Sequence, residues 1–271
     1  MSYNINVRIK ITYMRKYLII FSGFVAVICL SAWSFSNRKA DISQYLNVFS
    51  SEKTESANSG WVYWFVRESQ TEKINLKMTY VDKQTELHPP HTHPEKEIYY
   101  IIEGQAEVFI NGKTKVIGPN SSLFCPPGTL HGIRRADDKP LKYLVIKDNK
   151  GKSVVDKEPL PEYTIDDCIT VFDSQKVDKT KTGYFFWFAP KATTRGLNLK
   201  MTYVDELTGT HEPHQHAGEE ILYLLEGTAE AHINGEIKVI EPNTSIYYPE
   251  HSLHCIKRAN DKPIKYLVIN H

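Results

Sequence analysis

The octapeptide NLKMTYVD occupies residues 75–82 and recurs unchanged at residues 198–205, an offset of 123 residues. The same offset continues without a gap through the rest of each half, where it aligns Trp64 with Trp187 and the pentapeptide KYLVI at 142–146 with its copy at 265–269. Self-similarity at one fixed spacing indicates a duplicated structural unit. The chain therefore contains two copies of one domain.

Each copy is predicted to be all-β. Its apolar runs are short, rich in Ile, Val, Tyr and Phe, and interrupted by Gly, Pro or Asn every eight to twelve residues, which is typical of a sandwich or barrel. Asn111-Gly112 and Asn234-Gly235 lie between alternating apolar runs and predict two-residue hairpin turns. We expect a first domain at residues 41–148, a polar linker at 149–163 and a second domain at 164–271.

Residues 1–36 predict a signal peptide or a signal anchor. Tyr17 to Phe35 contain no charge and follow a basic stretch that includes Arg15 and Lys16, which is the layout of an export signal. Met14 begins a shorter leader and is an alternative start. We expect an exported protein, periplasmic or otherwise extracytoplasmic, that contacts the membrane only through an uncleaved leader. A buried core helix is the alternative interpretation of the apolar run.

Charge and cysteine content exclude some classes of protein. The formal net charge of +1 is spread along the chain without a basic block, so the sequence predicts no nucleic-acid partner. Cys29 lies in the leader, which leaves Cys125, Cys168 and Cys255 in the body, an odd number without CxxC spacing. We expect packing cysteines rather than a disulfide framework. A small-molecule substrate is the expected partner, and a homo-oligomer is left open.

A chelating pattern occurs once in each copy. His91, His93 and Glu97 are all odd-numbered, so an extended segment from Pro90 to Ile102 would place them on one face. His131 follows a Pro-Pro-Gly turn and can supply a fourth ligand from a neighbouring strand. Three imidazoles and one carboxylate suit a divalent Mn, Fe, Co, Ni, Cu or Zn ion and leave positions open for water or substrate. The second copy repeats the spacing with His214, His216, Glu220 and His254.

These motifs resemble those of the cupin superfamily. They read HTHPEKEIYYIIEG and PPGTLH in the first copy, and HQHAGEEILYLLEG and PEHSLH in the second, with His251 in place of the glycine of the second motif. The resemblance covers residues 60–148 and 183–271. It implies two tandem jelly-roll barrels, each with one divalent transition metal (Fe, Mn, Cu, Ni or Zn) inside its mouth.

Further residues are candidates for the pocket. His88 and His211 precede each chelating pair by three residues and are candidates for substrate contact, with a position in a rim loop as the alternative. Arg135 and Arg258 would bind a carboxylate substrate if they pointed inward, or pair with the acidic turn that follows them. Tyr99, whose counterpart is Leu222, is a candidate acid or base, with barrel packing as the alternative.

The catalytic candidates are therefore Tyr99, Glu97 and Glu220, since either carboxylate could act as a base. Trp64 and Trp187 are assigned to the core. An open-sided metal can polarise a bidentate oxygen donor, stabilise an enolate or present dioxygen.

The resemblance implies a dioxygenase, isomerase, lyase or decarboxylase, and we expect a metal-dependent enzyme on a small oxygen-rich molecule, with a dioxygenase slightly favoured. A non-catalytic protein that binds a sugar or small acid is the competing hypothesis, because the fold alone does not determine the reaction.

Overall fold

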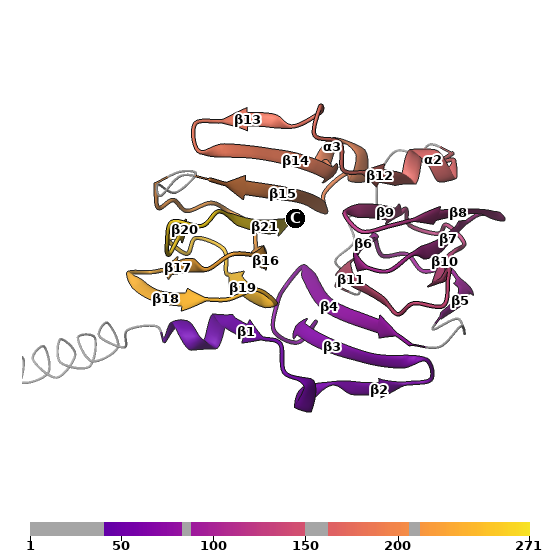
Figure 1. Ribbon diagram of the computed structural model, residues 1–271, viewed down its shortest axis with the longest axis horizontal. Coiled ribbons are helices and arrows are strands. Elements are labelled where there is room, and N and C mark those ends of the chain that lie inside the picture. The colour runs from indigo at the N-terminus through magenta and orange to yellow at the C-terminus, as the bar shows by residue number, and fades with distance from the viewer. Residues whose placement is uncertain (1–40, 83–87, 150–161, 206–211) are drawn as a thin grey trace, which may run out of the picture. The chain divides into compact units, whose positions relative to one another are not determined.

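The computed structural model describes residues 41–82, 88–149, 162–205 and 212–271 (Figure 1). Ile42–His271 forms one compact unit. The first repeat contributes η1 (Ile42–Tyr45), β1 (Leu46–Val48), η2 (Ser51–Lys53), β2 (Glu55–Ala57), β3 (Gly60–Val66), β4 (Ile74–Val81), β5 (His88–His91), β6 (Glu97–Glu103), β7 (Ala106–Ile110), β8 (Lys113–Ile117), β9 (Ser121–Cys125), β10 (His131–Arg135) and β11 (Leu141–Asp148).

The second repeat follows the same plan. It contributes α2 (Ile165–Cys168), β12 (Ile169–Val171), β13 (Asp178–Thr180), β14 (Gly183–Ala189), α3 (Lys191–Thr194), β15 (Asn198–Val204), β16 (Glu220–Glu226), β17 (Ala229–Ile233), β18 (Glu236–Ile240), β19 (Thr244–Tyr248), β20 (His254–Arg258) and β21 (Ile264–Asn270).

Each barrel consists of a large sheet facing a small one. In the first, a seven-stranded sheet (β12-β9-β6-β11-β4-β3-β2) faces a four-stranded sheet (β5-β10-β7-β8). In the second, a seven-stranded sheet (β1-β19-β16-β21-β15-β14-β13) faces a three-stranded sheet (β18-β17-β20). The predicted hairpins form at Asn111-Gly112 and Asn234-Gly235, where all four residues have positive φ as a type I′ turn requires. The all-β, double jelly-roll prediction is confirmed.

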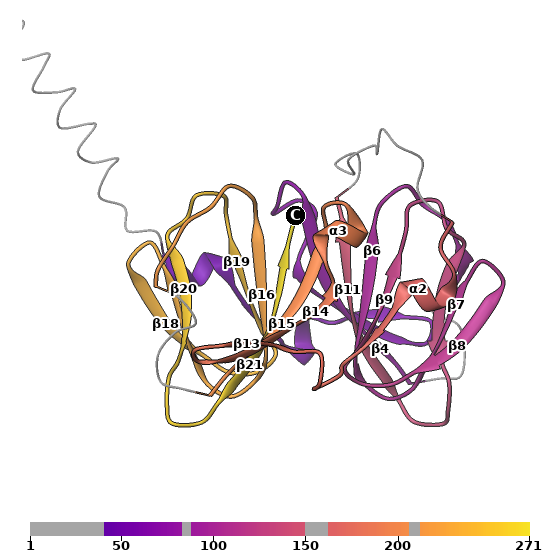
Figure 2. The same ribbon diagram turned by 90° about the horizontal axis from the view of Figure 1, so that it is seen from above.

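The two repeats exchange an edge strand. β1 of the first repeat pairs with β19 of the second barrel, in the register Leu46 to Ile246. β12 of the second repeat pairs with β9 of the first barrel, in the register Ile169 to Leu123. Figure 2 shows the indigo β1 segment beside β19, and α2 against the magenta first barrel. Leu46 and Ile169 are themselves 123 residues apart, so the exchange obeys the symmetry of the repeat.

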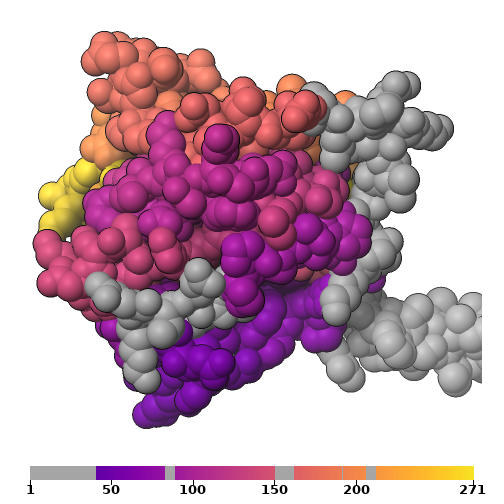
Figure 3. All heavy atoms as spheres, turned by 90° about the vertical axis from the view of Figure 1, so that its right-hand side faces the viewer, coloured from indigo at the N-terminus to yellow at the C-terminus, as the bar shows by residue number. Residues whose placement is uncertain are grey.

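An aromatic core joins the barrels. Phe65 packs edge-on against Tyr223 with ring centroids 5.1 Å apart, and their counterparts Phe188 and Tyr100 repeat the contact at 5.1 Å. All four rings belong to one buried cluster drawn from both repeats. Edge-to-face geometry is favourable for aromatic pairs beyond the area that they bury. The barrels are therefore joined by a shared core, and Figure 3 shows salmon-coloured atoms of the second repeat lying directly against magenta atoms of the first.

Polar contacts fix the register between the barrels. The buried carboxylate of Glu219 accepts hydrogen bonds from the backbone amides of Glu72 and Lys73, at 2.6 and 2.8 Å, and from the Tyr247 hydroxyl at 2.7 Å. At the equivalent position of the first barrel, the buried Lys96 donates to the backbone carbonyl of Arg195 at 3.0 Å. Each of these residues immediately precedes the glutamate of its chelating set, so barrel contact and site share one turn.

Some predictions lie outside the described residues, including the leader, His211 and most of the proposed linker. In the part of the chain that the structure describes, no helix is long and apolar enough to cross a membrane. Cys125, Cys168 and Cys255 are free and buried, as expected of packing residues.

Gly104 tests how tightly the end of β6 packs. A Cβ atom there would lie 2.2 Å from the Pro140 carbonyl oxygen, and φ is +83°. Gly112 has a nearly equal φ of +84° but no atom within 4 Å of the added Cβ. We expect Gly112→Ala to lower the free energy of unfolding by roughly 1–2 kcal/mol from the left-handed backbone alone. Gly104→Ala should cost roughly 3 kcal/mol or more because the backbone must also move.

Urea unfolding with an unchanged m-value measures both costs. Equal costs for the two substitutions would show that the Pro140 contact relaxes freely.

Candidate metal centre

The first chelating set converges at one end of the first barrel. His91 ends β5, His93 lies in the turn that follows, Glu97 begins β6 and His131 begins β10. One ligand atom from each of the four residues lies within 4.8 Å of every other. The prediction of one extended segment from Pro90 to Ile102 is wrong, because residues 92–96 lie outside any strand and contain a bend between β5 and β6.

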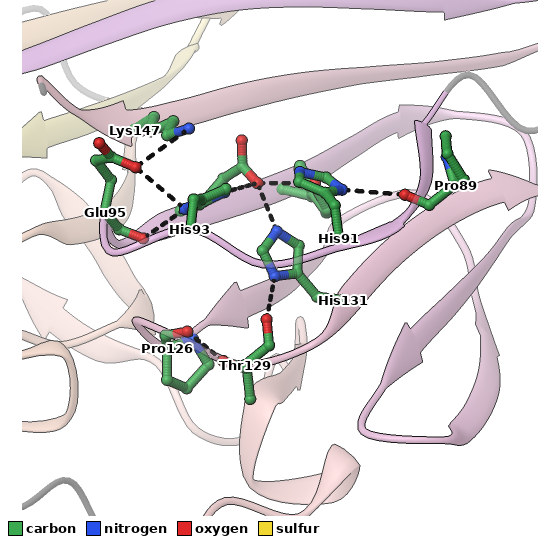
Figure 4. A network of polar contacts seen from close by, with 10 residues as sticks. Pro89, His91, His93, Glu95, Pro126, Thr129, His131 and Lys147 are labelled. Atoms are coloured by element: carbon green, nitrogen blue, oxygen red, sulfur yellow. Dashed lines mark hydrogen bonds and ion pairs between the residues drawn. The ribbon is translucent and has the colours of Figure 1, made fainter.

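Backbone carbonyls orient the imidazole rings. His91, His93 and His131 direct Nδ1 at carbonyl oxygens of Pro89, Glu95 and Thr129, at 3.1, 2.9 and 2.9 Å. A carbonyl only accepts, so Nδ1 carries the hydrogen and the Nε2 lone pair is left for a ligand. Figure 4 shows the three rings turned toward one another with these carbonyls behind them. Such outer contacts are the usual support of metal-binding histidines.

Glu97 completes this centre. Its Oε2 lies 3.3 Å from His93 Nε2 and 3.1 Å from His131 Nε2, and it accepts a hydrogen bond from the Tyr99 hydroxyl at 2.8 Å. Burial alone would raise the pKa of Glu97, but the contacts with His131, His93 and Tyr99 outweigh it and hold the pKa well below its ordinary value. A divalent cation would displace the hydrogens that these imidazoles otherwise share with Glu97, because a metal takes neutral histidines and an ionised carboxylate as ligands. The donor set therefore fits a divalent transition metal.

The second set is more open. His214, His216 and His254 have ligand atoms within 4.8 Å of one another. Glu220 stands farther off, with oxygens 3.7 Å from His216 Nε2 and 3.6 Å from His254 Nε2. Burial opposes ionisation of Glu220, but contacts with His216 and His254 prevail and lower its pKa to about 2.

A backbone carbonyl also orients a histidine of the second set. His254 directs Nδ1 at the Ser252 carbonyl, 2.8 Å away. Its buried Nε2 has no hydrogen-bond partner among the described residues, which again leaves a lone pair for a metal. Asn270 donates to Glu220 Oε2 at 3.3 Å, where the first barrel uses Tyr99.

The two centres differ by the place of one tyrosine. In the first barrel, Tyr99 donates to the glutamate, and Cys125 occupies the neighbouring strand. In the second, Leu222 replaces Tyr99 and Tyr248 replaces Cys125. Tyr248 stacks on His254 at 4.2 Å between ring centroids and donates to the Cys255 carbonyl instead. Only the first centre therefore has a phenol bonded to its carboxylate in the described structure.

The arginines proposed for substrate binding have other partners. Arg135 donates to the backbone carbonyls of Asp137 and Asp82. Arg258 donates to those of Asn260 and Asp205. The expected pairing with the turns occurs through carbonyls rather than carboxylates, and neither arginine lines a cavity containing the chelating sets. This geometry speaks against an inward role.

Other predicted residues have separate outcomes. His88 begins β5 opposite Ile133, and nothing in the described side chains bears on its role. His251 has φ +62°, so it adopts the backbone of the glycine that it replaces. The core assignment of the tryptophans was wrong for Trp187, which is 37% exposed. Trp64 is half-buried and lines the cavity of the first centre.

Sequence reasoning missed a pair of lysines. Lys77 lines the first cavity beside His91 and Glu97, and Lys200 lines the second beside His214 and Glu220. Both belong to the repeated NLKMTYVD, where every second residue faces the barrel interior. The sequence did contain a signal for them, because each lysine occupies an inward-facing position of an otherwise buried strand.

Metal binding tests the two centres separately. We expect about two equivalents of divalent metal in the protein and about one after replacing either His91 and His93 or His214 and His216 by alanine, since each pair removes two of its centre's donors. Elemental mass spectrometry of protein purified without chelators measures this. A chelator should strip the second centre first, because Glu220 stands farther from its histidines. Unchanged metal content in either double variant would contradict the assignment of that centre.

Comparisons with known proteins agree with this geometry. Residues 78–147 and 203–270 match the family described as Cupin domain. A 60-residue segment is 38% identical to dimethylsulfoniopropionate lyase DddQ of Ruegeria pomeroyi, and it covers 22% of this chain and 29% of that protein.

Solved structures extend the likeness to both barrels. Oxalate decarboxylase from Bacillus subtilis at pH 4.6 superposes with a TM-score of 0.65 at 16% identity, over 85% of this chain and 77% of that one. AerE from Microcystis aeruginosa gives 0.60 at 17% identity, over 80% and 95%. At such identities these structures bear on the fold alone. The family matches span about half of the chain, one in each barrel, and the chain belongs to the cupin domain family.

Proposed function

We propose that this protein is a metal-dependent enzyme that acts on a small oxygen-rich molecule by proton transfer, as a lyase or decarboxylase, with the first barrel as its catalytic centre. The observation that supports this most directly is the hydrogen bond from Tyr99 to Glu97 within the chelating set. The curated relative is named a lyase and one of the structural relatives a decarboxylase. The lyase matches only 22% of this chain and the decarboxylase is only 16% identical, so the substrate of neither is transferred.

The residues of the first cavity suit this chemistry. A divalent metal held by His91, His93, Glu97 and His131 would polarise a coordinated oxygen and stabilise negative charge on the substrate. Burial, followed by the Glu97 charge, raises the pKa of Tyr99 well above its ordinary value, so the phenol keeps its proton at neutral pH. Tyr99 keeps its proton and already shares a hydrogen bond with Glu97, so this pair can exchange a proton with a substrate whose acidity the metal would raise.

Removing the Tyr99 hydroxyl tests the catalytic assignment. Metal-loaded protein in D2O is offered hydroxy acids, keto acids, sugars, oxalate and dimethylsulfoniopropionate, with products and deuterium incorporation followed by NMR. We expect Tyr99→Phe to lower kcat by about 10²- to 10⁴-fold without loss of metal. Tyr143→Phe is the matched control, because this buried tyrosine packs on Tyr99 at 5.6 Å between ring centroids, and its hydroxyl forms no hydrogen bond with any residue that the structure describes.

Other results would support the competing hypotheses. Turnover that consumes oxygen and is insensitive to Tyr99→Phe would favour the dioxygenase. Tight binding of one of these compounds, with neither turnover nor deuterium exchange, would favour a binding protein.

We also propose that the protein is exported. The uncharged stretch from Tyr17 to Phe35 behind a basic segment supports this. Cell fractionation should recover the protein outside the cytoplasm, and N-terminal sequencing of the mature form should begin near residue 37. A cytoplasmic protein beginning at Met1 or Met14 would contradict the proposal.

A further inference from the structure

Lys77 and Lys200 occupy inward-facing positions. Along β4, Val81 belongs to the core of the first barrel, whereas Leu76 and Met78 belong to the core between the barrels. Because side chains alternate along a strand, Lys77 shares the face of Val81. Lys200 has the same position on β15. Burial lowers the pKa of both ammonium groups, which reflects the cost of holding a cation there.

Aromatic rings pack against these two lysines. Lys77 lies opposite Trp64 in the sheet register, with Nζ 5.3 Å from the ring centroid. Lys200 lies opposite Trp187, with Nζ 5.5 Å from that ring and 5.4 Å from Phe185. Such cation–π contacts stabilise the charge but use none of the N–H donors.

Neither ammonium group forms a hydrogen bond or an ion pair with any residue that the structure describes, whereas the outward lysine Lys142 pairs with Glu103 at 2.5 Å. The equivalent Lys265 pairs with Glu226, also at 2.5 Å. The donors of Lys77 and Lys200 therefore remain available to a ligand.

Each lysine shares a cavity with a chelating set. The first cavity, of about 310 Å³, is lined by Lys77 together with His91, Glu97 and Tyr99. The second, of about 320 Å³, places Lys200 with the second set. Volumes of this size suit a small molecule. Glu68 and Lys147 also line the first cavity and offset each other in charge, so a divalent metal with Lys77 against Glu97 would leave it positively charged. The same sign results in the second cavity from a divalent metal with Lys200 against Glu220.

We propose that Lys77 and Lys200 are carboxylate-binding residues, and that each cavity takes a small carboxylic acid whose carboxylate pairs with the lysine while the rest of the molecule faces the chelating set. An ammonium–carboxylate hydrogen bond is charge-assisted and strong in a cavity of this kind. The conclusion deepens the proposed function and rests on it for the reaction. Binding itself can be measured without turnover.

Calorimetric titration of the zinc-loaded protein tests the inference, with malonate as the probe and inorganic phosphate and glycerol as comparisons. Lys77→Met and Lys200→Met keep the apolar stem and remove the charge. We expect malonate to bind about 10- to 100-fold more weakly when both are replaced, and each single variant to affect one class of site. Lys77→Arg should retain most of the affinity, and Lys113→Met, at an exposed position of β8, controls for net charge.

A stability measurement separates ligand binding from a structural role. If the lysines serve a ligand, the melting temperature of the metal-free Met variants should be equal to or above that of the parent protein, because an inward charge is removed. A large fall, with malonate binding unchanged in the variants that remain folded, would overturn the inference. Tighter binding of phosphate or glycerol than of malonate would overturn the choice of a carboxylate.

The two proposals fail in different ways. Lysine-dependent malonate binding without turnover of any compound would leave the carboxylate site standing and refute the enzyme. Turnover of a neutral compound, unaffected by Lys77→Met and Lys200→Met, would support the enzyme and refute the carboxylate site. Tyr99→Phe should lower kcat by about 10²- to 10⁴-fold while leaving malonate affinity within about threefold, since the phenol bonds to Glu97 and a change of that size lies below 1 kcal/mol.

Discussion

Burial of both faces of each large sheet is the constraint on which this molecule depends. One face of β4, β6 and β11 lies in the aromatic core shared by the barrels, and the other faces the interior of its own barrel. Alternate residues of a single strand therefore have different roles. Leu76 and Met78 help to join the barrels, and Lys77 between them faces the first cavity. A change at a buried residue of these strands therefore affects either the contact between the barrels or the interior of one barrel.

The turn before each chelating glutamate connects these two roles. Lys96 and Glu219 reach across to the opposite repeat, and the next residue in each case turns inward as a ligand candidate. A charge of opposite sign does the bridging in each barrel, which the duplication alone would not produce. The repeats have therefore diverged at their contact while keeping the backbone that supports it.

Much of this arrangement could be predicted from the sequence. The fixed offset of 123 residues predicted two equivalent barrels, and the histidine spacing predicted which side chains converge, because both depend on local order along the chain. The secondary structure of the first centre was predicted wrongly, because one extended strand was expected where residues 92–96 lie outside any strand. The pairing of β1 and β12 with the barrel of the opposite repeat was not predicted. Strand pairing between distant segments leaves only a weak trace in composition, and short edge strands such as Leu46–Val48 carry little pattern. Trp187 was assigned to the core from its residue type, but its side chain is 37% exposed and contacts Lys200, whose Nζ lies 5.5 Å from the ring centroid.

The exchange of β1 and β12 bears on how the chain is made. A ribosome delivers the first repeat well before the second, yet β9 of the first barrel lacks its outer neighbour β12 until residues 169–171 have been synthesised. β1 in turn waits for β19, which comes near the end of the chain. Neither half can reach its final form during synthesis, and an unpaired edge invites association with other chains. Folding of the complete chain as a single event avoids that exposure, and a half-length fragment left by early termination would be a target for proteolysis.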